Sequence, residues 1–201
     1  MEGLRNTQDA GGWSPADVRM SFFRKPITNK RPTGEPVSLF QVYYYVRSRE
    51  AMAQTEALRR IADHEEARRF KAANFDYITP SGTFTYCSDA SLLRHSGLLC
   101  MDLDGLGQRV EELFRKLIDE RTFRTLLLFR SPSGQGLKWF IHIDLSRCDH
   151  RTWFTAVRHY LMTTYRLDEK QVDPLCSNKS RACYLGYDPQ AYLMTELIEF
   201  F

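Results

Sequence analysis

The chain contains the run Leu98-Leu99-Cys100-Met101-Asp102-Leu103-Asp104-Gly105, an apolar stretch that carries two carboxylates and ends at a glycine. If this run is a β-strand, Asp102 and Asp104 project from one face and Leu103 enters the opposite layer. Two neighbouring carboxylates at the end of a buried strand repel each other and lose hydration. A hard divalent cation such as Mg²⁺ or Mn²⁺ would offset that cost, because it prefers carboxylate oxygen. The alternative is a pair of solvated acids at a strand terminus.

Length and composition predict a water-soluble, cytoplasmic protein with one domain or one domain with two lobes. The 201 residues are 43% apolar, which is enough for a substantial core. No apolar run approaches the roughly 20 residues that cross a bilayer, and the first residues lack a signal-peptide apolar region. The net charge of +3 permits a nucleic-acid partner but does not require one.

The cysteines indicate reduced thiols rather than a disulfide framework. The five of them include no Cys-x-x-Cys pair and are scattered along the chain. A zinc site is a weaker alternative, because the spacing of the candidate ligands matches no standard site. These candidates are Cys148, His150, Cys176 and Cys183.

Hydrophobic periodicity predicts an α+β fold. Helices are expected over 37–46, 48–73, 106–120 and 150–165, and strands over 75–78, 82–86, 97–104, 125–129, 137–144 and 182–187. From residue 97 onward this order is β-α-β-β-α-β, so we expect a ferredoxin-like (RRM-like) core over 97–188, with an N-terminal α/β lobe before it. Two helices would cover one face of the four-stranded sheet and leave the other face open to a ligand. The strands over 75–78 and 82–86 are expected to form a hairpin or a tight corner.

The same pattern gives a domain plan. Residues 1–20 are expected to be loosely ordered, and 21–190 to form the main domain. That domain divides into an N-terminal lobe, 21–96, and an RRM-like lobe, 97–190. The tail 191–201 ends in apolar residues, which predicts a cut from a longer protein.

The stretch from Arg130 to Lys138, a turn over 130–136 and the start of the next strand, is the second informative stretch. Its glycines, Gly134 and Gly136, allow backbone N–H groups near Ser133 to converge on an anion such as phosphate. Lys138 then adds a point charge for the same anion. The alternative is a hairpin turn that simply requires glycine.

Asp173 and Arg181 complete the set of candidate site residues. A third carboxylate would complete a metal site, and an arginine would hold a phosphate with its fork. Position alone favours a turn-initiating aspartate and a surface arginine. Taken with Asp102, Asp104 and Lys138, however, these residues are typical of metal-assisted nucleotidyl transfer. In a ferredoxin-like sheet the first and third strands are neighbours, so we expect the Asp102 strand beside the Lys138 strand.

The sequence resembles the VirE N-terminal domain family of bacterial mobile-element and replication proteins over about residues 20–190. The matching runs are Ser81-Gly82-Thr83-Phe84, residues 95–104, residues 131–138, Ser180-Arg181-Ala182-Cys183-Tyr184 and Tyr187-Asp188-Pro189. That family looks like a primase-polymerase branch of the archaeo-eukaryotic primase superfamily. In relatives its partner is often a helicase-like region.

The resemblance implies that Asp102, Asp104 and Asp173 bind Mg²⁺ or Mn²⁺ and that Ser133 to Lys138 bind the incoming nucleotide. Arg130 and Arg181 would contact its phosphates. Lys138 stands where the superfamily usually has histidine, and lysine cannot reproduce the hydrogen bonding of a neutral imidazole.

These features predict a metal-dependent nucleotidyltransferase that extends or starts a strand on a single-stranded template with NTP or dNTP. One alternative is a non-catalytic nucleic-acid or nucleotide-binding module of a mobile-element or replication protein. A metal-dependent nuclease or a cyclising nucleotidyltransferase would use similar carboxylates.

Overall fold

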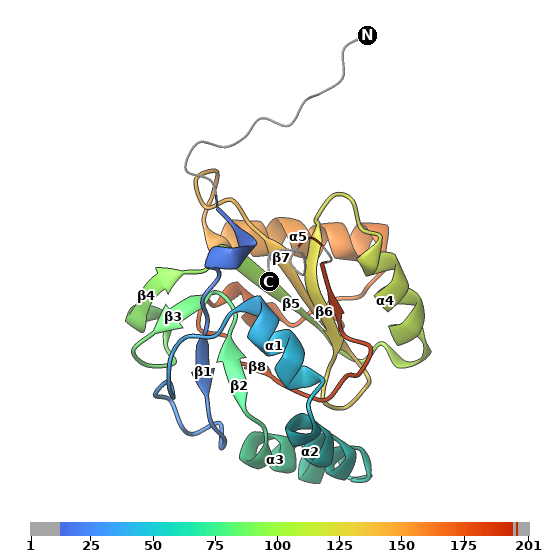
Figure 1. The fold of residues 1–201 in the computed structure, drawn as a ribbon. Helices are drawn as coiled ribbons and strands as arrows, with labels where there is room; N and C mark the ends of the chain where they lie inside the picture. The colour runs from blue at the N-terminus through green and yellow to red at the C-terminus, as the bar shows by residue number, and fades with distance from the viewer. Residues whose placement is uncertain (1–12, 195, 197–201) are drawn as a thin grey trace.

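A computed structural model describes residues 13–194 and Glu196. In this part of the chain, five α-helices and three antiparallel sheets form a mixed α+β fold (Figure 1). The helices are α1 (Leu39–Val46), α2 (Arg49–Arg59), α3 (His64–Asn74), α4 (Val110–Ile118) and α5 (His150–Thr164). The strands are β1 (Ser21–Phe23), β2 (Tyr77–Thr79), β3 (Gly82–Phe84), β4 (Leu92–His95), β5 (Leu98–Leu103), β6 (Thr125–Arg130), β7 (Leu137–His142), β8 (Cys183–Tyr184) and β9 (Tyr192–Leu193). None of the described helices combines the length and apolarity needed to span a membrane.

The central sheet has the strand order β5-β7-β6-β9. Strand β5 runs antiparallel to β7, with Met101 opposite Trp139 and Asp102 opposite Lys138. The prediction that the Asp102 and Lys138 strands are neighbours is therefore confirmed. This register decides the site, because it places an acid and a base side by side on the same face of the sheet.

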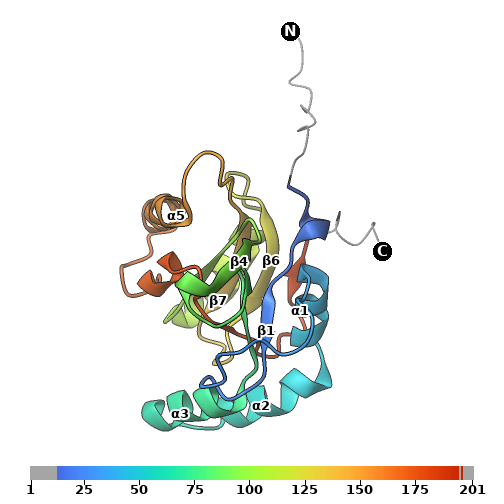
Figure 2. The same cartoon turned by 90° about the vertical axis from the view of Figure 1, so that its left-hand side faces the viewer.

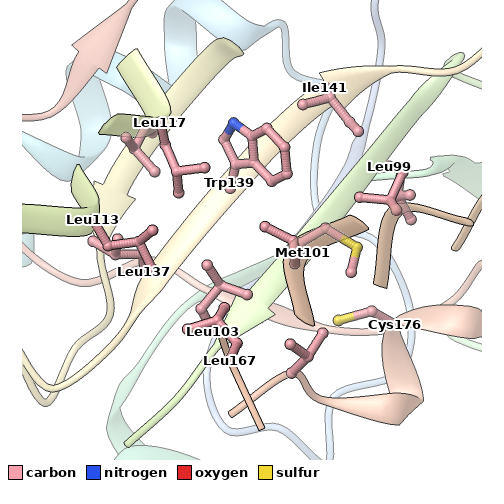
Figure 3. Close-up of a cluster of buried hydrophobic side chains, with 14 of the residues drawn as sticks. Leu99, Met101, Leu103, Leu113, Leu117, Leu137, Trp139, Ile141, Leu167 and Cys176 are labelled. Atoms are coloured by element: carbon pink, nitrogen blue, oxygen red, sulfur yellow. The ribbon is translucent and has the colours of Figure 1, made fainter. Parts of the chain in front are cut away.

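Helices α4 and α5 cover one face of this sheet. Alternate residues of β5 and β7, including Met101 and Trp139, point into a core that also contains Leu113 and Leu117 of α4 (Figure 3). The indole N–H of Trp139 donates to the Thr125 hydroxyl at 2.7 Å, so the polar atom of this buried ring is satisfied.

The opposite face of the sheet is covered as well, so the prediction of an open ligand face is wrong. Helix α1 and β1 lie on the side of the sheet away from α5 (Figure 2). Val42 and Val46 of α1 belong to the same buried cluster as Cys100 and Phe140. The physical reason is that α1 has its own apolar stripe, which must be buried against another element. The end of this face that carries Asp102 and Lys138 is polar.

Of the two alternatives predicted for strands β2 and β3, the structure has the tight corner and not the hairpin. Strand β2 lies between β1 and β8, β3 pairs with β4, and a turn at residues 80–81 joins them. The Pro80–Ser81 link is held instead by Ser96, whose hydroxyl donates to the Pro80 carbonyl at 2.7 Å. Strand β8, the expected last strand of the core, joins β2, and β9 occupies the free edge of β6.

The helix predicted over 48–73 is two helices, α2 and α3. A second capping residue divides them, since the Asp63 carboxylate accepts from the Glu66 backbone N–H at 2.7 Å and starts α3. Helix propensity is high on both sides of this break, which is why periodicity alone misses it.

Parts of both predicted terminal segments pack onto the fold. Of residues 1–20, the described ones begin at Trp13, whose ring stacks on His142 with centroids 3.9 Å apart. Met20 is fully buried and pairs with Val37. In the predicted tail 191–201, Tyr192 and Leu193 form β9, whereas residues 195 and 197–201 lie outside the described part.

Candidate functional site

A short backbone pairing brings the three candidate acids to one corner of the sheet. The Asp173 N–H donates to the Asp102 carbonyl at 3.0 Å, and the Asp104 N–H donates to the Gln171 carbonyl at 3.0 Å. The segment that carries Asp173 thus lies antiparallel to the end of β5, and Val172 forms a β-bridge there. This pairing brings the backbones of the three acids close together.

Asp102 and Lys138 form a buried ion pair across β5 and β7. Their exposed fractions are only 7% and 5%. Burial opposes the charge of the Lys138 ammonium, but the neighbouring negative groups, Asp102 foremost and Asp104 with it, together raise the lysine pKa above its usual value. The second carboxylate oxygen of Asp102, Oδ1, is buried and has no hydrogen-bond partner among the described residues. Such an atom is costly unless a ligand, ion or water satisfies it.

Asp173 and Arg181 form a second ion pair beside the first, at 2.5 Å. Asp173 also caps the short helix Pro174–Ser177 and accepts from the Leu175 N–H at 2.9 Å. Burial disfavours the charge of Arg181, but the negative groups around it, Asp173 foremost and Asp102 with it, together raise the pKa of the guanidinium. Asp173 is therefore oriented by two partners before any ligand arrives.

Asp104 differs from the other two acids because it makes no ion pair in the described structure. Although Asp104 retains an exposed surface, desolvation of its carboxylate raises its pKa, and the charges of Asp102 and Asp173 raise it further. Lys138 and Lys71 oppose this rise in the pKa of Asp104, so both acids and bases act on this carboxylate.

A cavity of about 10 Å³ lies beside the Asp102–Lys138 pair. This volume holds about one water molecule, so a nucleotide would have to bind at the surface around it. Its lining residues are Pro80, Ser81, Cys100, Asp102, Lys138, Cys176, Asn178, Arg181, Ala182 and Cys183. Burial raises the pKa of the Cys100 and Cys176 thiols, so both thiols are neutral at physiological pH.

The glycine turn lies next to Asp104. A Cβ atom on Gly136 would come within 2.1 Å of the Leu103 carbonyl oxygen and 3.0 Å of Asp104 Oδ1. The turn closes on itself, since the Ser131 N–H donates to the Gly136 carbonyl and the Gly134 N–H to the Ser131 carbonyl, both at 2.8 Å. The Ser133 hydroxyl accepts from the Gln135 N–H at 3.3 Å. The structure thus places the turn at the site but directs these N–H groups into the turn itself.

Arg130, predicted to contact phosphate, is committed to two carboxylates. Its guanidinium donates to Glu111 at 2.7 and 2.8 Å and to Asp188 at 3.0 Å, and it lies 4.3 Å from the Phe114 ring centroid. Such a network stabilises the fold, so we leave Arg130 out of the proposed site.

Lys71 is a site residue that the sequence did not single out. Burial lowers its pKa, as does the positive charge of Lys138, while Asp104 and Asp102 raise it. Its ammonium lies 5.6 Å from the centroid of the Tyr184 ring. In the sequence Lys71 is one of several basic residues on a helix rich in glutamate, and only the fold separates it from its solvated neighbours.

The site suits a divalent cation chemically but does not present ready-made ligands. The candidate ligands are carboxylates, the donors that Mg²⁺ and Mn²⁺ prefer, and Asp102 Oδ1 is a buried oxygen in need of a partner. Yet in the described ranges no group of three or more His, Cys, Asp or Glu side chains could hold a metal ion. The zinc alternative has no support either, because His150 bonds His95 at 3.2 Å and the Cys176 carbonyl at 3.1 Å.

Comparison with family models adds an independent finding. The model of the BT4734-like, N-terminal domain matches residues 69–193. The chain belongs to the BT4734-like N-terminal domain family. This assignment corrects the resemblance to the VirE N-terminal domain and the primase families, which the comparison does not support. The BT4734-like region includes Lys71, the three acids and Arg181. No curated protein and no solved structure matches the chain.

Proposed function

We propose that this chain is a metal-dependent nucleotidyltransferase that uses NTP or dNTP and acts on a nucleic-acid strand. The observation that carries the proposal is the meeting of three acids with three bases at the end of β5. The acids are Asp102, Asp104 and Asp173, and the bases are Lys71, Lys138 and Arg181. Acids suit the cation and bases suit the triphosphate, so both halves of a metal–nucleotide complex have partners here.

Each group has a role that follows from its position. The three acids would hold Mg²⁺ or Mn²⁺, which when bound supplies Lewis acidity and favours deprotonation of an attacking hydroxyl. Lys138 and Arg181 would neutralise charge on the phosphates and on the departing pyrophosphate. Lys71, on helix α3, would add a third positive charge for the same phosphates.

The strand order supports a ferredoxin-like relationship as part of the same proposal. The succession β5-α4-β6-β7-α5, with β7 between β5 and β6, matches the first five elements of that arrangement. The segment at Val172 then takes the edge of β5 that the last strand would occupy.

The test is incorporation of a labelled nucleotide on a primed or unprimed single-stranded template with Mn²⁺. We expect Asp102→Asn and Asp104→Asn to lose at least about 100-fold in rate. The matched control is Asp119→Asn, an exposed aspartate after α4. Equal incorporation by the wild type and both site variants would refute the proposal.

A second candidate function, nucleic-acid binding without catalysis, is favoured by one surface. On α1, Tyr44 is 56% exposed and its ring centroid lies 4.5 Å from that of Phe40 and 5.6 Å from that of Tyr43. The Arg47 guanidinium lies 4.8 Å from the Tyr43 ring centroid. Exposed aromatic rings beside arginine are the means by which proteins stack single-stranded bases.

This candidate predicts binding of an oligonucleotide in EDTA. Stacking on Tyr44 would contribute about 1–3 kcal/mol, so Tyr44→Ala should weaken binding at least about 5-fold. Tyr86→Ala, at another exposed tyrosine, is the control. Fluorescence anisotropy measures both. Binding that requires Mn²⁺ or ignores Tyr44 would exclude this function.

A further inference from the structure

We propose that the site binds a divalent cation and a triphosphate only together. The cation draws the acids away from their basic partners, and the triphosphate then binds those basic side chains. The inference rests on the proposed function. It concerns the form in which the substrate binds: a metal–triphosphate complex, rather than a cation first and a nucleotide second.

The first step concerns a cation binding alone. A cation at the free Oδ1 of Asp102 would share the single negative charge of that carboxylate with Lys138, which pairs with Oδ2 and is only 5% exposed. A buried ammonium that loses part of its counter-charge is strongly unfavourable. The cation would also add positive charge near an ammonium that burial already disfavours. A cation alone therefore binds weakly.

The second ion pair adds the same obstacle. If Asp173 turns to the cation, Arg181 loses its partner at 2.5 Å. Arg181 Nε is already buried and without a hydrogen-bond partner in the part of the chain described. The guanidinium therefore has an unmet donor even before the exchange, which a phosphate oxygen would satisfy.

The third step concerns a triphosphate binding alone. It would withdraw Lys138 and Arg181 from the acids and bring further negative charge close to Asp102, Asp104 and Asp173. Asp104 already experiences the charges of the other two acids. Removal of the two cations that offset them would make this corner strongly repel an anion.

When both ligands arrive together, every displaced charge has a new partner. The acids exchange two cationic side chains for the metal ion, and the side chains exchange carboxylates for phosphate oxygens. Because linkage is reciprocal, each ligand tightens the other by the same factor. We expect that factor to be about 100-fold, at the upper end of ordinary couplings between sites.

The experiment measures thermal unfolding of the whole chain with Mn²⁺ alone, with inorganic triphosphate alone, and with both. The expected result is a shift with both ligands that clearly exceeds the sum of the separate shifts. A shift with Mn²⁺ alone as large as with both would overturn the inference. Absence of any shift under all three conditions would overturn it as well, because no ligand site would then exist.

Titration of Mn²⁺ followed by electron paramagnetic resonance gives the second measurement. Lys138→Met removes the competing ammonium, so this variant should bind Mn²⁺ alone at least about 10-fold more tightly than the wild type. The control is Lys116→Met, whose ammonium pairs with Glu112 on the exposed surface of α4. If Lys138→Met does not fold, the thermal comparison on the wild type decides alone.

The outcomes separate this inference from the function on which it rests. Coupled binding without nucleotide incorporation would keep the inference and remove the nucleotidyltransferase. Nucleotide incorporation, together with equal Mn²⁺ affinity in the presence and absence of triphosphate, would keep the nucleotidyltransferase and remove the inference.

Discussion

Gly136→Ala tests the contact that joins the glycine turn to the acids. The new Cβ would lie 2.1 Å from the Leu103 carbonyl oxygen, where ordinary contacts begin at 3.4 Å. Backbone atoms cannot rotate out of the way as a side chain can, so the start of β7 and the end of β5 must separate by about 1 Å. We expect a loss of about 2–4 kcal/mol in the free energy of unfolding, which lowers Tm by about 5–15 °C.

The matched control is Gly105→Ala, two residues beyond β5. Gly105 has a φ of +62°, and a Cβ atom added there would have no neighbour within 4 Å, so alanine meets only backbone strain of about 1–2 kcal/mol. Circular dichroism melting of both variants gives the comparison. If Gly136→Ala melts with the wild type, or above Gly105→Ala, the close packing of turn and strand is refuted. Under the proposed function, a displacement of about 1 Å at Asp104 should also lower nucleotide incorporation by about 100-fold.

Three further predictions concern charge. Asp188→Asn should lower the free energy of unfolding, measured with urea, by about 3 kcal/mol, because Asp188 is 2% exposed and pairs with Arg130. A loss below about 1 kcal/mol would contradict this prediction. Burial and the neighbouring His150 lower the pKa of His95 to about 4. On acidification the imidazole of His95 is therefore protonated first in the unfolded chain, and stability should fall as pH drops from about 6.5 to 4. In the variant His95→Gln, the fall in Tm over this pH interval should be smaller than in the wild type. The raised pKa of Asp104 means that its ionised form destabilises the fold. Asp104→Asn should therefore raise Tm at neutral pH, and this gain in Tm should disappear below about pH 4. An unchanged or lower Tm at neutral pH would refute this prediction.

The sequence predicts the centre of the fold better than its surroundings. Alternation in β5 and β7 indicates which side chains share a face of the sheet. It correctly places Lys138 and Phe140 on one face and Trp139 on the other. Local periodicity contains this information, because successive side chains of a strand point to opposite faces of the sheet. The meeting of Asp102 with Lys138 follows from the predicted neighbour relation of the two strands.

Long-range pairings are what the sequence could not supply. Nothing local indicates that α1 covers the second face of the sheet, or that β8 joins β2. The same holds for the partners of the site residues. The sequence names Asp173 and Arg181 but not the ion pair between them, and it gives no reason to separate Lys71 from the other basic residues of its helix.

The outer sheet has a consequence for anyone who trims this protein. Its strands β1 and β8 come from opposite ends of the described chain and meet on β2. The family match starts at residue 69, so a fragment cut at that point would lack β1 and α1 and would expose the apolar face of the central sheet to water. Such exposed surface and an unpaired strand edge promote aggregation. The residues that the family model matches therefore leave out elements that bury the central sheet.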